Sequence, residues 1–564
     1  MLRLDSLRTI SLVAAAIVTV LVVTPLIWLF FGSFWSGSPG APGEFTTANY
    51  RNVYAEPLLY EALLNSATFA IGSTLVALGL GTPLAWIVTR TNTPFRRFFE
   101  VMALVPYMIP GILFAIGWAF LLSPRAGIIN ATLVRTLGLS GPPFNVFTLP
   151  GMIWVDGLTG IPLVFILVSA AFKNQDASLE EAARVSGSSH WRTFARISLP
   201  IMRPALLAAT TLSLVRYIEL FEVPAIIGLP AGIYLLTTLI FRQVAQHPPN
   251  YGAGTASAVT LLIFTVGLVY AYRTLTKRSE RFATLTGKGV RVGVLDLGRW
   301  RYLTLAYCLL LLLGTAALPM VILTLGSVLP YWGILSLEGW EKSFAGITLN
   351  HYTFALNLSI VQRAFANSII LALLGATLAM ALTATVGYLT TRLKTKASGL
   401  LEFVTFLPFA IPGLVMAVGF LWAYITLPIF GTIWLLLIAY ITRFMPYGLR
   451  ATTSTVIQIH TDLEDASRIA GASWLKTFRH VVIPLIKPGL VAGWIFLSII
   501  FLREVSASVL LYKSGSEVLA VVVYALYNDN QWEAVAAIGV IMTGITLILS
   551  ITALKLTGTR GVAL

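Results

Sequence analysis

The sequence predicts an all-α membrane protein of twelve transmembrane helices, arranged as two tandem halves of six helices each. Three observations support this fold class. Of the 564 residues, 57% are hydrophobic and only 11% are charged, whereas about 25% of an average soluble domain is charged. Twelve apolar runs are each long enough to cross a bilayer, which takes about 20 residues. The second half of the chain also repeats the pattern of the first.

The predicted helices follow one another along the whole chain. They lie at residues 10–32, 63–89, 100–122, 149–171, 203–228, 255–274, 303–328, 365–390, 402–427, 431–450, 486–511 and 534–555. The first run follows two arginines, as the core of a signal peptide would, but it spans about 22 residues and no small-residue cleavage site follows it. We therefore expect this run to be retained as a helix.

The basic residues orient the chain in the membrane. With the N-terminus placed in the cytoplasm, 28 of the 38 Lys and Arg residues fall in cytoplasmic segments, 7 on the opposite side and 3 within helices. Cytoplasmic loops of membrane proteins carry an excess of Lys and Arg, so both termini are predicted to be cytoplasmic. This topology signal accounts for most of the net charge of +15, and we expect no nucleic-acid partner.

An internal repeat divides the chain into halves. The stretch Glu180–Leu206 matches Glu464–Leu490 without a gap when the numbering is shifted by 284, and 10 of the 27 positions are identical. Further upstream the shift is 302, where Pro106-x-x-x-Pro110-Gly111 matches Pro408-x-x-x-Pro412-Gly413. We expect a first six-helix half at 1–275, a basic cytoplasmic linker at 276–300 and a second six-helix half at 301–564.

Six predicted crossings separate the two matched loops, so both loops face the same side, and their charges place that side in the cytoplasm. Each loop combines acidic residues, a glycine that interrupts a helix and an amphipathic stretch. An interfacial helix lying on lipid headgroups would show the same periodicity. The duplication and the acidic residues favour a surface on which another protein docks.

The residues of these loops resemble a known motif. Glu181-Ala182-Ala183-x-x-x-Gly187, followed after nine residues by Ile197-x-Leu199-Pro200, is similar to the EAA loop of the membrane subunits of binding-protein-dependent ABC importers. The second copy departs from the motif but keeps its charge and small residues. The resemblance implies a type I ABC importer permease fold, in which ATP binding to docked ATPase subunits rocks the two halves between inward- and outward-facing states.

The resemblance also implies the partners and the docking residues. The expected partners are two copies of a cytoplasmic ATP-binding subunit, a periplasmic or lipid-anchored solute-binding protein and the lipid of a bacterial inner membrane. The sequence contains no G-x-x-x-x-G-K-[ST] motif, so ATP and Mg²⁺ are expected on the partner chains, and this chain is expected to hold no cofactor and to be no enzyme. The ATPase-docking residues would be Glu180, Glu181, Ala182, Ala183, Gly187, Pro200, Glu464, Asp465, Ala466, Ser467, Gly471 and Pro484.

Charged residues within the predicted helices are candidates for the substrate path, since each costs about 2.5–3.5 kcal/mol at a helix centre. The candidates are Asp156, Arg216, Tyr217, Glu219, Glu222, Arg503 and Glu504. Mutual neutralisation is one interpretation, with Arg216 paired to Glu219 and Arg503 paired to a carboxylate of the other half. The other is a polar route between the halves in which Glu219, Glu222 and Glu504 transiently bind a metal cation such as ferric iron, or an organic cation.

The fusion of two such loops in one chain resembles the ferric iron and thiamine importers, and the linker region 280–302 is more similar to the ferric iron group. We therefore expect ferric iron as the cargo, with thiamine or another small solute as alternatives. A secondary transporter would also explain tandem halves, but it needs no ATPase dock. A membrane enzyme is disfavoured, because the sequence offers no catalytic constellation at usable spacing.

Overall fold

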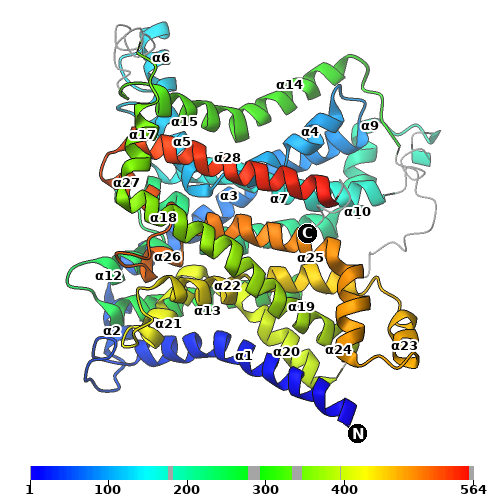
Figure 1. The fold of residues 1–564 in the computed structure, drawn as a ribbon. Helices are drawn as coiled ribbons and strands as arrows, with labels where there is room; N and C mark the ends of the chain where they lie inside the picture. Colours follow the sequence, from blue (N-terminus) through cyan, green and yellow to red (C-terminus); the bar gives the residue numbers. More distant parts are fainter. Residues whose placement is uncertain are drawn as a thin grey trace. The chain divides into compact units, whose positions relative to one another are not determined.

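The structure, a computed structural model, describes residues 2–175, 182–183, 185–276, 293–332, 346–393 and 395–557. All twelve predicted segments consist mainly of helix over their described residues, four of them with short breaks, which confirms the all-α fold class (Figure 1). Apart from two isolated bridges, Trp35 with Phe45 and Thr91 with Leu295, this described part of the chain forms no β-structure.

The number of membrane-crossing helices differs from the prediction. By length and composition, 8 described helices could cross a membrane, or up to 11 if each of three bent pairs counts as one span. Two further predicted spans are helical as well: α11 (Arg203–Glu219) has only 17 residues, and α22 (Ile433–Val456) contains two arginines that lower its hydropathy. One bent pair, Pro224–Ala231 with Leu236–Ala245, lies partly beyond the predicted fifth span.

The described chain divides into two compact units. The first comprises Met1–Leu59, Leu236–Leu262 and Asn350–Leu564. Its helices are α1 (Leu2–Ser33), α2 (Ala48–Ala55), α12 (Leu236–Ala245), the first part of α13 (Tyr251–Thr276), α17 (Asn350–Asn357), α18 (Ser359–Ile370), η8 (Leu371–Gly375), α19 (Ala376–Leu393), α20 (Lys396–Phe406), η9 (Leu407–Ala410), α21 (Gly413–Tyr424), α22, α23 (Asp462–Ile469), α24 (Trp474–Thr477), η10 (Phe478–Val482), α25 (Ile483–Leu502), α26 (Ser508–Leu511), α27 (Leu519–Asn528) and α28 (Trp532–Thr557).

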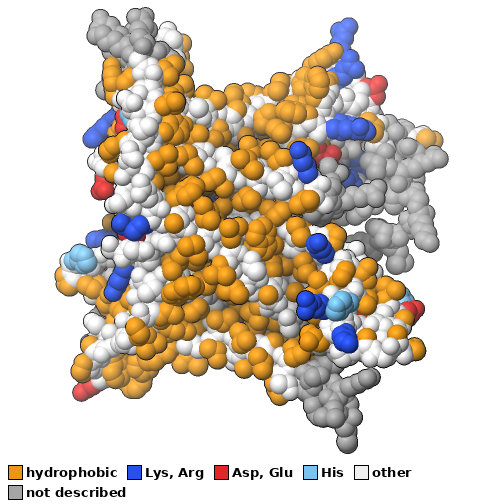
Figure 2. Space-filling model, viewed as in Figure 1, with side chains coloured by type: hydrophobic (Ala, Val, Ile, Leu, Met, Phe, Trp, Pro, Cys, Tyr) orange, Lys and Arg blue, Asp and Glu red, His pale blue; other side chains and the backbone are white. Residues whose placement is uncertain are grey.

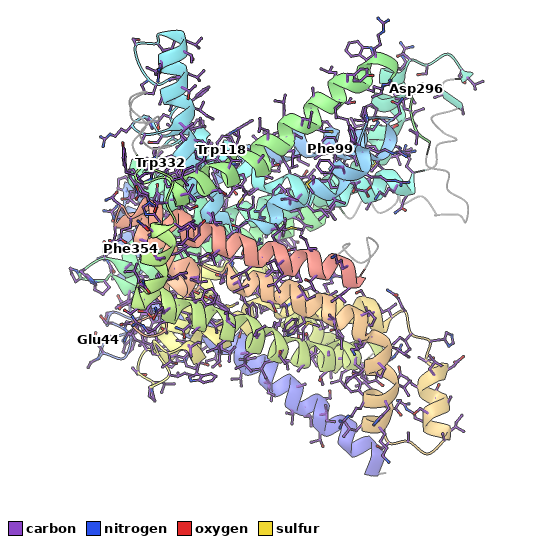
Figure 3. All side chains as sticks on the ribbon, turned by 45° about the horizontal axis from the view of Figure 1, so that its top comes forward. Glu44, Phe99, Trp118, Asp296, Trp332 and Phe354 are labelled. Carbon is purple, nitrogen blue, oxygen red and sulfur yellow. The ribbon has the colours of Figure 1, made fainter. Side chains whose placement is uncertain are left out.

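The second unit comprises Tyr60–Leu235 and Ile263–Leu349. Its helices are α3 (Pro57–Arg90), α4 (Arg96–Met102), η1 (Val105–Met108), α5 (Gly111–Leu122), α6 (Ile128–Leu137), α7 (Leu149–Asn174), α9 (His190–Thr193), η2 (Phe194–Ser198), α10 (Leu199–Ile201), α11, η3 (Pro224–Gly228), η4 (Leu229–Ala231), the rest of α13, η6 (Gly298–Trp300), α14 (Arg301–Leu312), η7 (Leu313–Ala317) and α15 (Leu318–Val328). Figure 3 shows Asp296 and Trp332 near opposite ends of the continuous run from α14 to α15.

The compact units do not follow the sequence halves, because the first helix of each half, and also α12 with the first part of α13, belong to the unit built mainly from the other half. Helix α1 packs chiefly against α21 and also against α20, both from the second half. Helix α15, near the start of the second half, packs against α5 of the first half. The expected division at residues 276–300 therefore describes the sequence repeat, and residues 277–292 of that linker lie outside the described part.

Helix α1 presents apolar side chains outward as well as inward. Val18, Val22 and Leu29 are buried, while Leu12 and Ile27 are exposed. Hydrophobic side chains likewise cover much of the visible surface of the first unit in Figure 2. A helix that is apolar all round is typical of a membrane-spanning segment, so this face is where lipid would lie.

The third predicted helix of each half is broken at the repeated Pro-Gly pair. The two parts meet at 97° in the first half and at 107° in the second. Pro110 and Pro412 lack an N–H and force the preceding residue into an extended conformation, as found for Ile109 and Ile411. Each predicted span is therefore two helices, with α5 and α21 beginning directly after the proline.

The described end of the linker is held against the end of α3. The Leu295 N–H donates to the Arg90 carbonyl at 2.7 Å, and the Asn92 N–H donates to the Leu295 carbonyl at 3.1 Å. The Asp296 carboxylate accepts from the Gly298 N–H and the Asn92 side chain, and these bonds lower the pKa of Asp296. The segment that leads into the second half is thereby fixed to the first.

We predict that Gly419→Ala destabilises the first unit. A β-carbon at Gly419 would overlap the Pro25 carbonyl oxygen of α1, and overpacking of this kind costs about 1–3 kcal/mol. The melting temperature of the detergent-purified protein should fall. The matched control is Gly267→Ala in α13, where a β-carbon would meet nothing within 4 Å. Equal melting temperatures for the two variants would contradict the packing of α1 on α21.

Candidate functional site

The two matched loops, called here the first repeat loop (residues 175–201) and the second repeat loop (residues 459–485), share one backbone plan. Gly187 and Gly471 have φ of +80° and +88°, the left-handed region that favours glycine. The Ser188 N–H donates to the Ala183 carbonyl at 3.0 Å, and the Ala472 N–H donates to the Ser467 carbonyl at 3.1 Å. In each loop this hydrogen bond closes a turn of six residues, as in a Schellman-type cap at the end of a helix. The prediction that the glycine ends a helix is therefore confirmed.

An arginine at the end of a spanning helix anchors the start of each repeat loop. Arg90, at the end of α3 and 2% exposed, donates to the Gln175 carbonyl at 2.7 Å. Arg392, near the end of α19, donates to the Ile459 carbonyl at 2.9 Å. The two arginines match at the shift of 302, whereas Gln175 and Ile459 match at the shift of 284. The same contact is therefore made twice, which supports both spacings of the repeat.

In the second repeat loop, the anchor extends to a carboxylate. Glu464 is 3% exposed and accepts hydrogen bonds from Arg392 Nε at 2.7 Å and from the Tyr388 hydroxyl at 2.6 Å. The Tyr388 ring also packs edge-on against Phe478, with ring centroids 5.0 Å apart. Helix α23 is thus fixed to α19 by an ion pair and a hydrogen bond, and the aromatic contact joins α19 to η10 (Phe478–Val482).

The predicted docking residues occupy different environments. Glu464 points into the protein, whereas Asp465 is exposed and lies 3.9 Å from Arg468. The Ser467 hydroxyl is hydrogen bonded to Thr477 at 3.0 Å. Glu180 and Glu181 lie outside the described residues. The remaining predicted docking residues are Ala182, Ala183 and Gly187, Pro200 in α10, Ala466 in α23, Gly471, and Pro484 in α25.

Each repeat loop also exposes an apolar residue that the sequence analysis did not single out. Val185 is 90% exposed and Ile469 is 88% exposed. The two match at the shift of 284, so they occupy the same position, two places before the glycine. The sequence did contain a signal for these two residues, because an apolar side chain stands at the same position of both repeat loops, among polar residues. Tyr388 and Arg392 were missed because they are distant in sequence from the loop that they hold.

Intramembrane charges of the first half gather between α7 and α11. Arg216 donates to the Thr159 carbonyl at 3.2 Å and to the Thr159 hydroxyl at 3.0 Å, and its pairing with Glu219 stays a prediction. The Thr159 hydroxyl in turn donates to Asp156 Oδ1 at 2.6 Å. The Tyr217 hydroxyl donates to the Asp156 carbonyl at 3.2 Å. These contacts join three of the predicted path residues in one network, with Thr159 at its centre.

The second half holds a different charge arrangement. Arg443 of α22 forms an ion pair with Glu504, and Glu504 Oε1 also accepts from the Ala507 N–H at 2.9 Å. The Tyr440 hydroxyl donates to the Glu504 carbonyl at 3.3 Å. The sequence analysis did not name Arg443 among the path or pairing residues, because its partner lies on another helix far along the chain.

The glycine after each helix break lies against these charges. A β-carbon at Gly111 would overlap Glu222 Oε2, and one at Gly413 would overlap the Arg443 guanidinium. The described residues contain no group of three or more His, Cys, Asp or Glu that could hold a metal ion. Contact of a metal with Glu219, Glu222 or Glu504 therefore stays a prediction about cargo in transit, as does a partner carboxylate for Arg503.

A comparison with protein families decides the identity. Residues 77–281 and 375–556, more than half of the sequence, match the family described as binding-protein-dependent transport system inner membrane component. The chain belongs to this family. It is an ABC importer permease of the binding-protein-dependent class, with two family segments fused in one multi-pass inner membrane protein, and it is not an enzyme. Each family segment contains one repeat loop.

Curated relatives of this importer permease cover most of its length. The ferric transport system permease protein FbpB of Actinobacillus pleuropneumoniae is 24% identical over 527 residues, 92% of this chain and 74% of that protein. The Fe(3+)-transport system permease protein FbpB 2 of Haemophilus influenzae is 24% identical and covers 85% of this chain and 86% of that protein. The spermidine/putrescine transport system permease protein PotB of Escherichia coli is 29% identical over 42% of this chain and 86% of its own length.

A solved structure of a bacterial ABC transporter involved in the import of the acidic polysaccharide alginate is 18% identical to the permease. The similarity covers 46% of this chain and 91% of that chain, with a TM-score of 0.40.

We predict that Glu464→Gln loosens the second repeat loop of the permease. The change removes the charge that Arg392 and Tyr388 hold, and hydrogen bonds to a charged group are worth about 1.5–3 kcal/mol. Amide hydrogen exchange across 462–471 should accelerate. The matched control is the neighbouring Asp465→Asn, whose exposed side chain should leave exchange unchanged. Unchanged protection in Glu464→Gln would show that the ion pair does not anchor the loop.

Proposed function

We propose that this permease imports ferric iron delivered by a solute-binding protein. The alignment with ferric permease proteins over 92% of the chain carries the proposal. Carboxylates within the predicted membrane spans support it, since hard oxygen ligands suit a hard cation. Because a charge within the membrane is costly, an acidic group retained there is a candidate for contact with cationic cargo.

The motor would be a pair of ATP-binding subunits, one on each repeat loop, with ATP and Mg²⁺ bound by those subunits. Two loops of the same backbone plan, each hydrogen bonded to an arginine of a spanning helix, support this arrangement. A rigid anchor is required if force on a surface helix is to move the helix that carries it. Both loops and both chain termini would then face the cytoplasm, consistent with the distribution of Lys and Arg.

Within each dock, the exposed apolar residue would enter a groove of the ATPase, and in the second dock the exposed carboxylate of Asp465 would lie beside it. This division of roles assigns Val185, Ile469 and Asp465 to the interface and Glu464 to the support of the loop. Burial of one such side chain contributes about 1.5–3 kcal/mol. The two docks would therefore bind with similar strength although their sequences differ.

An organic cation is the second candidate cargo. The similarity of 42% of the chain to a spermidine/putrescine permease supports it, and carboxylates can bind ammonium groups as well as metal ions. Thiamine, expected as an alternative from the fused architecture, has no comparable support among these relatives.

ATP-dependent uptake of radiolabelled ferric iron tests the proposal. Membrane vesicles would contain the permease, its ATPase and the iron-loaded binding protein. Iron should accumulate only with ATP, and excess spermidine should not compete. Accumulation of labelled spermidine in place of iron would favour the second cargo, and uptake of either without ATP would exclude the proposed motor.

We predict that Val185→Asp combined with Ile469→Asp releases the ATPase from the permease. Both side chains are almost fully exposed, so the permease itself should fold normally while two apolar contacts are lost. Co-purification of the ATPase in mild detergent should fall by about tenfold or more. The conservative pair Val185→Ile and Ile469→Val should retain the complex. Full co-purification of the aspartate variant would remove these residues from the dock.

A further inference from the structure

Arginine and aromatic side chains gather where the linker leads into α14 and where the chain continues from α3 to α4. They belong to two short segments of the second unit, residues 94–98 and 299–302. Seven of the eight side chains are exposed, and the eighth, Arg96, is partly exposed. Together they are named here the arginine–aromatic patch: Phe95, Arg96, Arg97, Phe98, Arg299, Trp300, Arg301 and Tyr302.

Hydrogen bonds on both sides of the patch hold its two segments together. The hydroxyl groups of Thr93 and Thr304 are hydrogen bonded at 2.7 Å, and the Leu297 N–H donates to the Asn92 side-chain oxygen at 3.0 Å. These bonds join the residues just before Phe95 to residues just before and just after 299–302. Four arginines from distant parts of the sequence are therefore brought into one region.

The positive charge of the patch exceeds the acidic charge next to it in the chain. Residues 94–104 and 295–304 contain two carboxylates, Glu100 and Asp296. Glu100 forms an ion pair with Lys173 of α7 at 2.5 Å, so it does not offset the arginines. Asp296 accepts hydrogen bonds from the backbone and from Asn92 and also attracts Arg301. One carboxylate among four guanidinium groups leaves this surface positively charged.

A stripe of exposed apolar side chains runs from the patch along α14 and α15. Leu303, Leu310 and Val321 are all exposed, and their spacings of seven and eleven residues correspond to about two and three turns of a helix. Figure 2 shows hydrophobic side chains along α14 and Lys and Arg side chains where that helix begins. The stripe is therefore a surface for lipid acyl chains.

The length of this helical run places the patch at the level of the lipid headgroups. The run Gly298–Val328 is a candidate membrane span of 31 residues, whereas the hydrocarbon core of a bilayer takes about 20. Its first residues therefore extend beyond the hydrocarbon. Trp300, which is 70% exposed, and Tyr302 are there, and Trp and Tyr are the residues enriched at the membrane–water interface.

The backbone of Phe95 is a separate sign that an outside molecule covers this surface. Its φ is +59°, in the left-handed region that a bulky side chain rarely adopts. This conformation directs the ring outward, where it is 73% exposed. Strained residues persist where function requires the conformation. A lipid layer that receives the ring would give this conformation a function.

We propose that the arginine–aromatic patch binds the headgroup of an anionic phospholipid, whose acyl chains lie along the apolar stripe of α14. The guanidinium fork matches the geometry of a phosphate group, and basic residues beside a membrane span are attracted to anionic lipids. The apolar stripe that continues from the patch favours a lipid over a protein partner. The bound lipid would hold the linker end against the end of α3, where the two halves join.

Binding of radiolabelled phosphatidylglycerol to the full permease in mixed micelles tests the assignment, with phosphatidylcholine as the uncharged competitor. The unmodified protein should prefer phosphatidylglycerol. The triple variant Arg97→Gln, Arg299→Gln, Arg301→Gln should bind it about tenfold or more weakly, since three of the four guanidinium groups are lost. The matched control Arg51→Gln, Arg125→Gln, Arg135→Gln removes the same charge from exposed positions outside the patch and should bind as the unmodified protein does.

A second variant, Phe95→Asn, separates lipid binding from folding. Asparagine tolerates the left-handed conformation better than phenylalanine, so the melting temperature without added lipid should stay the same or rise. The affinity for phosphatidylglycerol should nevertheless fall, by about threefold, because an aromatic ring is lost from the interface. Unchanged affinity in this variant would contradict the role of the ring.

Three results would overturn the lipid assignment. The permease could bind both lipids equally, or the triple variant could bind phosphatidylglycerol as the control does. Inorganic phosphate could displace the lipid more effectively than potassium chloride of the same ionic strength, which would show a site for phosphate alone. If the triple variant keeps its lipid but no longer co-purifies with the ATPase, the patch contacts that protein instead. None of these measurements depends on the cargo.

Discussion

The anchoring of the two repeat loops by Arg90 and Arg392 is the interaction on which the proposed coupling in this permease depends. A surface helix can transmit force to the membrane only if it is attached rigidly to a spanning helix. Arg90 and Arg392 provide this attachment at the ends of α3 and α19 by holding the carbonyl at which each loop begins. In the second half, Glu464 completes the attachment, and its burial shows that acidic residues of such a loop do not all face a partner.

The halves keep the backbone of their common repeat but differ in the side chains that balance charge. In the first half, the guanidinium near Thr159 belongs to Arg216 of α11. In the second half, the guanidinium belongs to Arg443 of α22. The helix breaks and the neighbouring glycines are the same in both. The two halves thus share the helix breaks, whereas their charged side chains have different partners.

The exchange of first helices adds a physical reason for keeping both halves in one chain. Helix α1 packs on helices of the second half, and α15 packs on a helix of the first. The linker end is also hydrogen bonded to α3. Each compact unit therefore contains segments of both halves, and neither half includes all the helices of a unit.

The sequence by itself determined the helices, the repeat and the positions of the two loops. Apolar runs and turn residues act locally, so their lengths and the spacing of Gly187 and Gly471 could be recognised without a fold. The tertiary structure decided which side each charged residue faces and what it meets. Glu464 turned inward, Arg216 turned to Thr159, and Glu504 paired with Arg443 of a different helix. Such pairs depend on which helices pack side by side, and the pattern along a single helix does not specify its neighbours.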